Sequence, residues 1–221
     1  QNISMIMKKR ETVIIFSAHS DDFVIGAGGT IAKYSEEGKK VLVFVMSYGE
    51  KSHPWMKDNV TKKFRSEEAF KASEVLGCTT TFFNLKEFDF KEEAKRKRLI
   101  KKIKEIVITE KPSKIFTHSD EDPHPDHRAT HLLTLDVFDL LKKKPDVYIY
   151  SIWNPVSMKT LDVPKMYVDI SSTFKKKLQA LKLFRSQYQA ILPLSLQTLF
   201  RNLKAGLKIK KKMGEEFYKI K

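Results

Sequence analysis

Short apolar runs alternate with longer amphipathic stretches through the first two thirds of the chain. β-Branched and aromatic residues concentrate in five runs that are typical of strands, at residues 12–18, 41–47, 80–84, 114–118 and 147–152. Between these runs, apolar residues recur at helical spacing over residues 28–37, 61–76, 91–110 and 125–141. The alternation predicts an α/β fold, a Rossmann-like and mostly parallel sheet with helices on both faces.

The alternation weakens after residue 153. We expect one more strand at 165–170 and helices at 171–187 and 194–205. No Gly/Ser-rich linker separates this part from the rest. The sequence therefore predicts a single domain over 1–221, with a core at about 12–153 and a C-terminal extension at about 154–221.

Membrane and secretion signals are not found. The longest apolar stretches, 13–16 and 41–46, are far shorter than the roughly 20 residues that cross a bilayer. The first ten residues lack an apolar segment with a basic flank and a cleavage site, so we expect a cytoplasmic protein. A single cysteine, Cys78, excludes an internal disulfide and is expected to be a small buried residue.

The chain is strongly basic. Lys and Arg number 42 against 27 Asp and Glu, which gives a net charge of +15. Such a charge favours an anionic partner, so a nucleic-acid or membrane-surface binding protein is one alternative function. The basic residues lie mainly in helical stretches with interleaved acidic or apolar residues, as on solvated helix surfaces. We expect a small-molecule substrate and no specific nucleic acid, and a homo-oligomer stays open.

Clusters of His and Asp follow two of the predicted strands. The first comprises His19, Asp21 and Asp22, and the second lies within residues 118–127. Ligands of such sheets bind beyond the carboxyl ends of the strands, so we expect both clusters at one edge. Two His and a carboxylate can hold zinc with a position open for water, and the remaining carboxylates and His can serve as acid and base.

Each cluster also has a purely structural explanation. Asp21 or Asp22 could cap the helix that follows. For His124 and His127, surface exposure or helix capping is the ordinary explanation, and Asp126 could favour the positive end of a helix. The joint placement of the clusters after two strands favours the metal site.

Several other residues are ambiguous at this level. His118 and His131 are expected in the core or at a helix cap, although His131 could orient a metal ligand. Trp55 and Trp153 could form an aromatic wall for a sugar ring or could be packed in the core. The glycines at 26, 28 and 29 lack the spacing of a dinucleotide-binding loop, which would need glycine at Ile31, and indicate close helix–sheet packing.

In order and spacing, these motifs resemble the PIG-L/LmbE-like family of zinc de-N-acetylases. The family carries Ala/Pro-His-Pro-Asp-Asp after its first strand and His-x-Asp-His after a later one. The corresponding segments here are Ala18-His19-Ser20-Asp21-Asp22 and His124-Pro125-Asp126-His127. Gly28-Gly29-Thr30 and Arg65-x-x-Glu68 also match, so the resemblance covers about residues 12–131.

The resemblance implies a zinc-dependent hydrolase that removes the acetyl group from an N-acetylglucosamine-type sugar. The implied zinc ligands are His19, Asp22 and His127. The implied catalytic residues are Asp21 as general base and His124, which assists the tetrahedral intermediate, and the implied sugar contacts are Arg65 and Asp89. We hypothesise that His124 is protonated when it holds the oxyanion. A different metallohydrolase on the same edge, such as a phosphoesterase, is an alternative that the positive charge would suit.

Two positions depart from the family pattern. Ser20 stands where proline is usual, which we expect to change the rigidity of the loop more than its chemistry. Asp122 stands where some members place a tyrosine that assists the oxyanion, so that contribution is not expected here.

Overall fold

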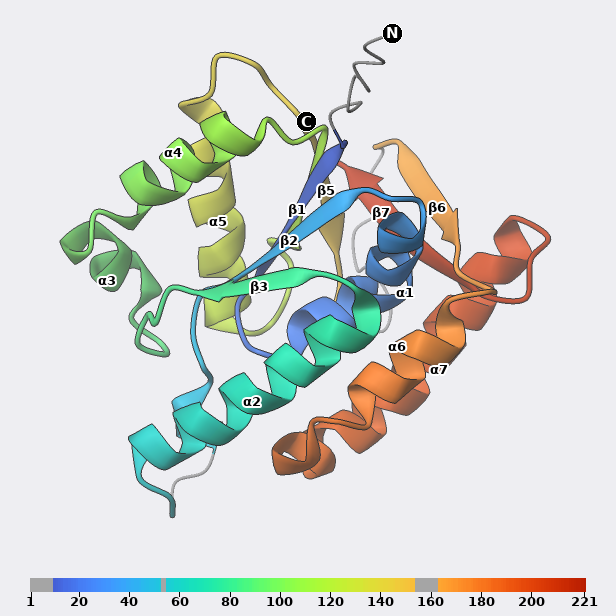
Figure 1. Ribbon diagram of the computed structural model, residues 1–221, viewed down its shortest axis with the longest axis horizontal. Coiled ribbons are helices and arrows are strands. Elements are labelled where there is room, and N and C mark those ends of the chain that lie inside the picture. The colour runs from blue at the N-terminus through green and yellow to red at the C-terminus, as the bar shows by residue number, and fades with distance from the viewer. Residues whose placement is uncertain (1–9, 53–54, 154–162) are drawn as a thin grey trace, which may run out of the picture.

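The computed structural model describes residues 10–52, 55–153 and 163–221. A seven-stranded sheet lies at its centre in the order β3-β2-β1-β4-β5-β7-β6 (Figure 1). The strands are β1 (Thr12–Ser17), β2 (Lys40–Val45), β3 (Thr79–Phe82), β4 (Lys114–His118), β5 (Asp146–Tyr150), β6 (Lys165–Asp169) and β7 (Gly214–Lys219). The α-helices are α1 (Asp22–Glu36), α2 (Asp58–Leu76), α3 (Phe90–Arg96), α4 (Leu99–Glu110), α5 (Pro125–Asp139), α6 (Phe174–Leu181) and α7 (Tyr188–Lys208).

The first five strands run parallel to one another. β1 pairs with β2 and β4, β2 pairs with β3, and β4 pairs with β5, all in parallel register. β7 is antiparallel to both β5 and β6. The predicted fold class, a single α/β domain with a mostly parallel sheet, is confirmed.

The central strands β1, β2, β4 and β5 are apolar on both faces because helices cover both faces. Val13 and Ile15 of β1 pack into the core under α1, α2, α6 and α7. Ile14 and Phe16, which point the other way, pack into the core under α3, α4 and α5. The two helical layers lie on opposite sides of the sheet (Figure 1). Cys78 is partly buried and packs against the first of these cores.

Two helices in the first half differ from the prediction. α1 begins at Asp22 and not at residue 28, so the first Asp cluster lies at its N-terminus. The single helix expected at 91–110 is two helices, α3 and α4, separated at Arg98, which has a left-handed φ of 50°. On one continuous helix Ala94 and Leu99 would lie about 140° apart. The break lets both pack into the same core.

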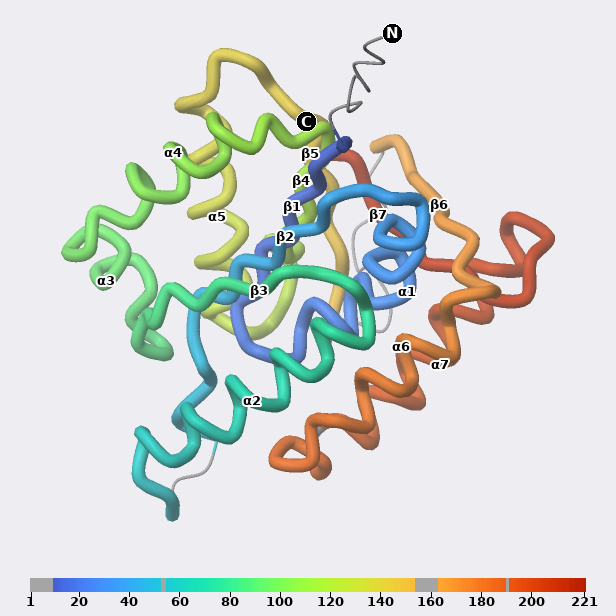
Figure 2. Tube along the Cα trace, in the orientation of Figure 1, coloured from blue at the N-terminus to red at the C-terminus, as the bar shows by residue number. Residues whose placement is uncertain are grey.

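The C-terminal segment returns to the sheet. Figure 2 traces it in orange and red from β6 through α6 and α7 to β7. The helix expected at 171–187 is shorter, and a 3₁₀ turn (Arg185–Gln187) follows it. The helix expected from residue 194 begins earlier, at Tyr188, so Pro193 lies inside α7. Proline has no backbone N–H and costs the helix one hydrogen bond, and the burial of Ile191 and Leu194 offsets that cost.

β7 was not predicted, because its sequence is polar. Its Glu215 is buried nonetheless, and the Oε1 atom lies 2.6 Å from Nζ of the equally buried Lys177 of α6. The same carboxylate accepts hydrogen bonds from the backbone N–H groups of Gly29 (3.0 Å) and Thr30 (2.7 Å) in α1. The pair therefore joins α1, α6 and β7.

The close packing predicted for the glycines of α1 is confirmed. A Cβ atom at Gly29 would lie 2.6 Å from the side chain of Ile170, and one at Gly26 would lie 2.3 Å from the ring of Tyr150. None of the helices in the described part of the chain has the length and apolar character needed to cross a membrane.

Candidate active site

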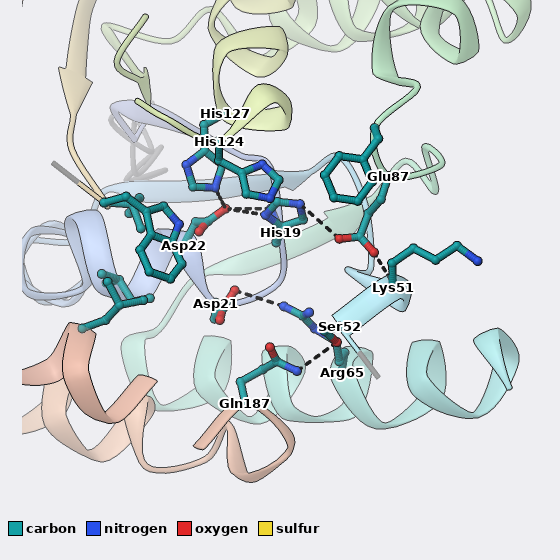
Figure 3. Close-up of a pocket in the computed structure, with 15 residues that line it drawn as sticks. His19, Asp21, Asp22, Lys51, Ser52, Arg65, Glu87, His124, His127 and Gln187 are labelled. Carbon is teal, nitrogen blue, oxygen red and sulfur yellow. Dashed lines mark hydrogen bonds and ion pairs between the residues drawn. The ribbon is translucent and has the colours of Figure 1, made fainter. Parts of the chain in front are cut away.

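The two His/Asp clusters meet in one pocket at the carboxyl ends of β1 and β4 (Figure 3). His19 and Asp21 lie in the turn between β1 and α1, and Asp22 is the first residue of α1. His124 is the N-cap residue of α5, and His127 lies in its first turn. The pocket is lined by His19, Asp21, Asp22, Ile25, Lys51, Ser52, Arg65, Glu87, Phe88, His124, His127, Ile152, Trp153, Gln187 and Leu194.

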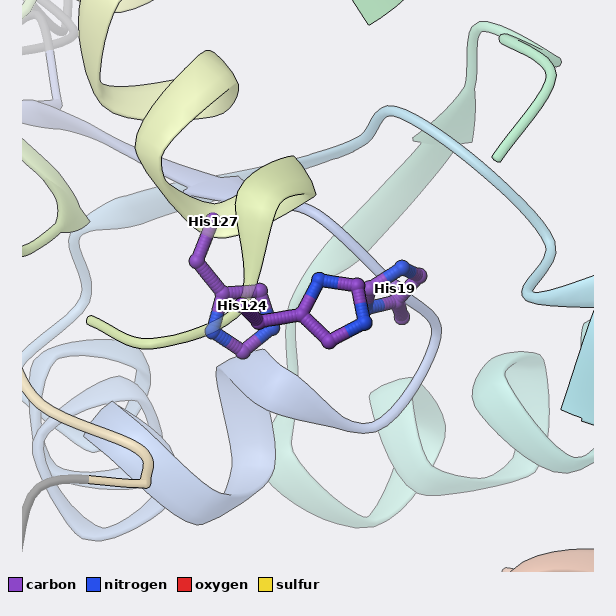
Figure 4. Close-up of side chains that lie close together, drawn as sticks. All are labelled: His19, His124 and His127. Atoms are coloured by element: carbon purple, nitrogen blue, oxygen red, sulfur yellow. The ribbon is translucent and has the colours of Figure 1, made fainter. Parts of the chain in front are cut away.

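Asp22 lies between the two histidines that were predicted to bind metal with it. Its Oδ2 atom is 3.4 Å from Nδ1 of His19 and 3.3 Å from Nε2 of His127. All three side chains are buried. The rings of His19 and His127 have their centroids 5.4 Å apart, and the His124 ring lies beside both (Figure 4).

His127 and His19, the two predicted histidine ligands, each have a second carboxylate beside one ring nitrogen. Asp122 Oδ1 is 2.9 Å from Nδ1 of His127, and Asp126 Oδ2 is 3.2 Å from Nε2 of His19. Each ring thus has one nitrogen held by a carboxylate and the other directed to Asp22. Such outer carboxylates fix the orientation of metal-binding histidines and raise their basicity.

Imidazole and carboxylate donors that could hold a divalent metal ion gather around the pocket, although the predicted ligands His19, Asp22 and His127 are shared among different groups. The described residues form three groups of potential ligands whose atoms lie within 4.8 Å of one another. The groups are His19, His124 and His127; Asp22, His118 and His127; and His19, Glu87 and Asp126. Within the described ranges, both ring nitrogens of His127 are buried without a hydrogen bond of good geometry, although carboxylate oxygens of Asp122 and Asp22 lie 2.9 and 3.3 Å from them. Imidazole and carboxylate ligands are those of catalytic zinc.

The ion pairs change the protonation of both histidines. Burial alone would lower the pKa of His19, but hydrogen bonds to Asp126 and Asp22 raise it to about 10. Burial opposes protonation of His127 too, and Asp22 and Asp122 raise its pKa to about 9. Without a metal, both rings carry protons at neutral pH, and a metal ion would take the place of those charges.

Asp21 faces the pocket and does not cap α1. It occupies the N-cap position but makes no side-chain capping hydrogen bond there. Its Oδ1 atom accepts a hydrogen bond of 3.1 Å from Nη2 of Arg65. Burial raises the pKa of Asp21, and the Arg65 charge opposes that rise. An ionisable carboxylate with an elevated pKa is suited to accept and return a proton.

Arg65 is buried beneath the pocket and holds the loops around it. Its Nε atom donates to Ser20 Oγ (2.9 Å) and its Nη1 atom to the Gly49 carbonyl (2.9 Å). Gly49 has a φ of 74°, and a Cβ atom there would lie 2.1 Å from Nη1. Ser20 therefore gives this chain a bond to Arg65 that a proline could not make.

His124 differs from the expectation of a protonated ring. Its Nδ1 atom accepts a hydrogen bond of 3.2 Å from the backbone N–H of Asp126, so it also caps α5. Burial, followed by the charges of His19 and His127, lowers the pKa of His124 to about 4. The ring is therefore neutral near pH 7, and the acceptor role of Nδ1 assigns the proton to Nε2.

Asp89, the second predicted sugar contact, is not among the pocket residues. It precedes α3, and its carboxylate accepts a hydrogen bond of 3.0 Å from Nη2 of Arg96. Glu87 lies in the pocket instead, with Oε1 3.5 Å from Nε2 of His19 and its other oxygen bound to the backbone N–H of Lys51. Burial raises the pKa of Glu87.

Two further histidines of the described residues, His118 and His131, lie behind the pocket. His118 is fully buried, and its Nε2 atom accepts a hydrogen bond of 2.9 Å from the backbone N–H of Ala18. The same atom lies 3.5 Å from Asp22 Oδ2. His131 Nδ1 is 2.9 Å from the His118 carbonyl. The core positions predicted for both are confirmed, and His118 also contacts the metal-ligand group.

Part of the pocket lining is apolar. The apolar lining residues are Ile25, Phe88, Ile152, Trp153 and Leu194. Trp55 is 77% exposed and is not among the lining residues, and residues 54 and 154–155 lie outside the described part of the chain. The cavity has a volume of about 240 Å³, which is room for a small organic group.

Comparison with known proteins identifies several relatives. The model of the GlcNAc-PI de-N-acetylase family (PIG-L) matches residues 14–138. A 4-oxalmesaconate hydratase from Pseudomonas putida is 27% identical over 197 residues, covering 80% of this chain and 74% of the hydratase. The diacetylchitobiose deacetylase of Thermococcus kodakarensis is 25% identical over 188 residues, covering 80% and 70%.

Among solved structures, the 4-carboxy-2-hydroxymuconate hydratase of Pseudomonas putida has the same fold. It superposes with a TM-score of 0.81 at 23% identity, over 96% of each chain. The matched family segment, residues 14–138, is more than half of the 221 residues and contains both His/Asp clusters. The chain therefore belongs to the GlcNAc-PI de-N-acetylase (PIG-L) family.

Proposed function

We propose that the protein is a zinc-dependent hydrolase that removes the acetyl group from an N-acetylglucosamine-type amino sugar or its conjugate. The observation that carries the proposal is the meeting of His19, Asp22 and His127 with Asp21 and His124 in one pocket. Membership of a de-N-acetylase family and a relative that is a diacetylchitobiose deacetylase support it.

His19, Asp22 and His127 would hold the zinc ion, with Asp126 and Asp122 behind the two rings. When bound, zinc lowers the pKa of a water ligand towards 7 and polarises an amide carbonyl. Glu87, on the other side of His19, would remain an acceptor within the pocket.

Asp21 is the proposed general base. It lines the pocket next to the ligand Asp22, and Arg65 holds its carboxylate in place. It takes a proton from the attacking water as the water oxygen bonds to the acetamide carbon. It then gives that proton to the sugar nitrogen when the carbon–nitrogen bond breaks, so acetate and a free amine leave.

His124 is the proposed oxyanion donor in its neutral form. Its Nδ1 atom is occupied by the Asp126 N–H, so the Nε2–H group is available to donate to the carbonyl oxygen as negative charge develops there. A donor fixed in this way does not need a protonation step. His124 is therefore proposed to act as a neutral ring and not as the protonated ring expected from the sequence.

The apolar part of the pocket lining is proposed to contact the sugar ring. Trp153 lines the pocket and is partly exposed, so it offers a surface to the C–H face of the ring. The charged lining does not select the charge of the substrate, because the carboxylates of Asp21, Asp22 and Glu87 are offset by Lys51, Arg65 and the metal ion that would bind there.

Acetate release tests the proposal. Zinc-loaded protein is incubated with N-acetylglucosamine and its short β-linked oligomers, with and without a chelator, and acetate is measured. We expect chelator-sensitive release that returns when zinc is restored. Turnover of a generic phosphate ester, with none of any acetamido sugar, would favour the phosphoesterase alternative instead.

A hydratase is the second candidate, because a 4-oxalmesaconate hydratase matches 80% of the chain. The same base and metal site could activate water for addition to a double bond. Loss of the absorbance of 4-oxalmesaconate upon incubation with the protein, without any acetate from acetamido sugars, would establish this candidate.

A further inference from the structure

One face of α7 carries apolar side chains that are exposed. We call this face the apolar stripe. Its members are between 37% and 75% exposed, and they are Tyr188, Leu192, Leu196, Phe200, Leu203 and Leu207. They recur every three or four residues, which places them along one side of the helix. The opposite side, with Leu194, Thr198 and Ala205, is buried. The stripe is therefore additional to the face that α7 needs for folding.

The segment that contains the stripe has many basic residues and no acidic ones. Between Asp169 and Glu215 the sequence contains no acidic residue. It contains eleven basic ones: Lys175, Lys176, Lys177, Lys182, Arg185, Arg201, Lys204, Lys208, Lys210, Lys211 and Lys212. This segment therefore supplies most of the net charge of +15.

Two of the basic residues have internal roles. Lys177 is buried against Glu215, and Arg201 donates to the Ser151 carbonyl. Lys204 and Lys208 are exposed and belong to α7 itself, beside Leu203 and Leu207. A helix with an exposed apolar stripe and lysines at its border has the features of helices that lie in a membrane interface.

We propose that the apolar stripe of α7 binds the surface of anionic lipid membranes. Leucine and phenylalanine side chains would enter the boundary between headgroups and acyl chains, and lysines would contact lipid phosphates. A second copy of the chain would bring two uniformly basic segments together, so its charge opposes that contact. A nucleic acid would satisfy the lysines but leave the stripe in water.

The stripe and the candidate active site share α7. Leu194 lies in the wall of the pocket, and Gln187, which immediately precedes the helix, also lines it. Binding through the stripe would therefore hold the pocket near the lipid surface. α7 lies on the face of the sheet opposite to α5 (Figure 1).

Vesicle cosedimentation tests this proposal without any measurement of activity. The zinc-loaded protein is mixed with phosphatidylcholine vesicles that contain either no or about one third phosphatidylglycerol. We expect sedimentation with the anionic vesicles only, and less of it when salt is raised from about 50 to about 500 mM. Leu196→Gln/Phe200→Gln should reduce binding about tenfold or more. Lys204→Gln/Lys208→Gln should reduce both the binding and its salt dependence.

Leu132→Gln is the matched control. Leu132 is 60% exposed on α5, so its substitution removes a comparable side chain from the other face and should leave vesicle binding unchanged. Thermal unfolding verifies that all variants are folded. Equal binding by the stripe variant and the wild type, or no binding to anionic vesicles, would overturn the proposal. A wild-type dimer that the stripe variant dissociates, with no vesicle binding, would assign the stripe to a second copy.

Discussion

Two adjacent aspartates have different surroundings in this pocket. Burial favours the neutral form of both, but His127 and His19 hold the pKa of Asp22 well below its usual range. Asp21 faces Arg65 and the open pocket, and burial raises its pKa. Neighbouring groups whose pKa values are pushed apart usually have different roles. Asp22 therefore suits a metal ligand and Asp21 a base.

The substitution Asp21→Asn tests this division. Asparagine can still accept the hydrogen bond from Arg65, so the loop should keep its shape, but it cannot take a proton. We expect a loss in kcat of about 10²–10⁴-fold with zinc still bound at one ion per chain. Asp120→Asn, in an exposed position of the β4–α5 loop, is the control and should retain activity. Loss of zinc in Asp21→Asn would mean that base and ligand have been confused.

Asp122 is expected to act on the metal site through His127. Its carboxylate lies 2.9 Å from Nδ1 of His127 and orients that ring. Asp122→Asn should weaken zinc affinity about 10–100-fold, as measured by competition with a chromophoric chelator. Asp120→Asn serves again as control, and equal zinc affinity in the two variants would show that Asp122 does not act on the metal site.

Sequence reasoning identified individual site residues better than their partners. His19, Asp22 and His127 stand in recognisable motifs after two strands, so their convergence could be predicted from topology. The contacts of Asp122 with His127 and of Asp126 with His19 depend on how the β4–α5 loop and the first turn of α5 are placed, which spacing does not specify. Glu87 has no motif, and only its position in the pocket reveals it.

At the scale of elements, apolar strands were predictable and the polar one was not. β1, β2, β4 and β5 are buried between two helical layers, so their apolar runs are visible in the sequence. β7 contains two adjacent glutamates, and one of them is buried by pairing with Lys177 from another element. That pairing is a tertiary contact, so no local pattern indicates a strand there.

The buried pair predicts a large effect on stability. Glu215→Gln leaves the Lys177 charge buried without its counterion, so we expect a loss of about 3–5 kcal/mol in the free energy of unfolding. Glu216→Gln, at the next residue, removes only a 3.2 Å contact to the partly exposed Lys165 and should cost less than about 1 kcal/mol. Urea unfolding measures both. Similar losses in the two variants would contradict a structural role for the buried pair.

For the whole molecule, proton release should accompany metal binding. In the metal-free protein His19 and His127, with pKa values of about 10 and about 9, are protonated below those values. Zinc must displace these protons, so its affinity should rise as pH increases, by up to about 100-fold per pH unit for two protons. Zinc affinity between about pH 6 and about pH 8 measures this. An affinity that does not change over this range would mean that the rings are already neutral.

A zinc titration of the metal-free protein, with acetate and free amine measured at each point, tests the central claim most directly. The proposed function predicts equal amounts of acetate and amine from an N-acetylated amino sugar, rising with zinc until one equivalent is bound. It also predicts that Asp21→Asn binds the same equivalent and releases both products about 10²–10⁴-fold more slowly. Acetate release that is independent of zinc, or its absence from every acetamido sugar at one bound equivalent, would contradict the account.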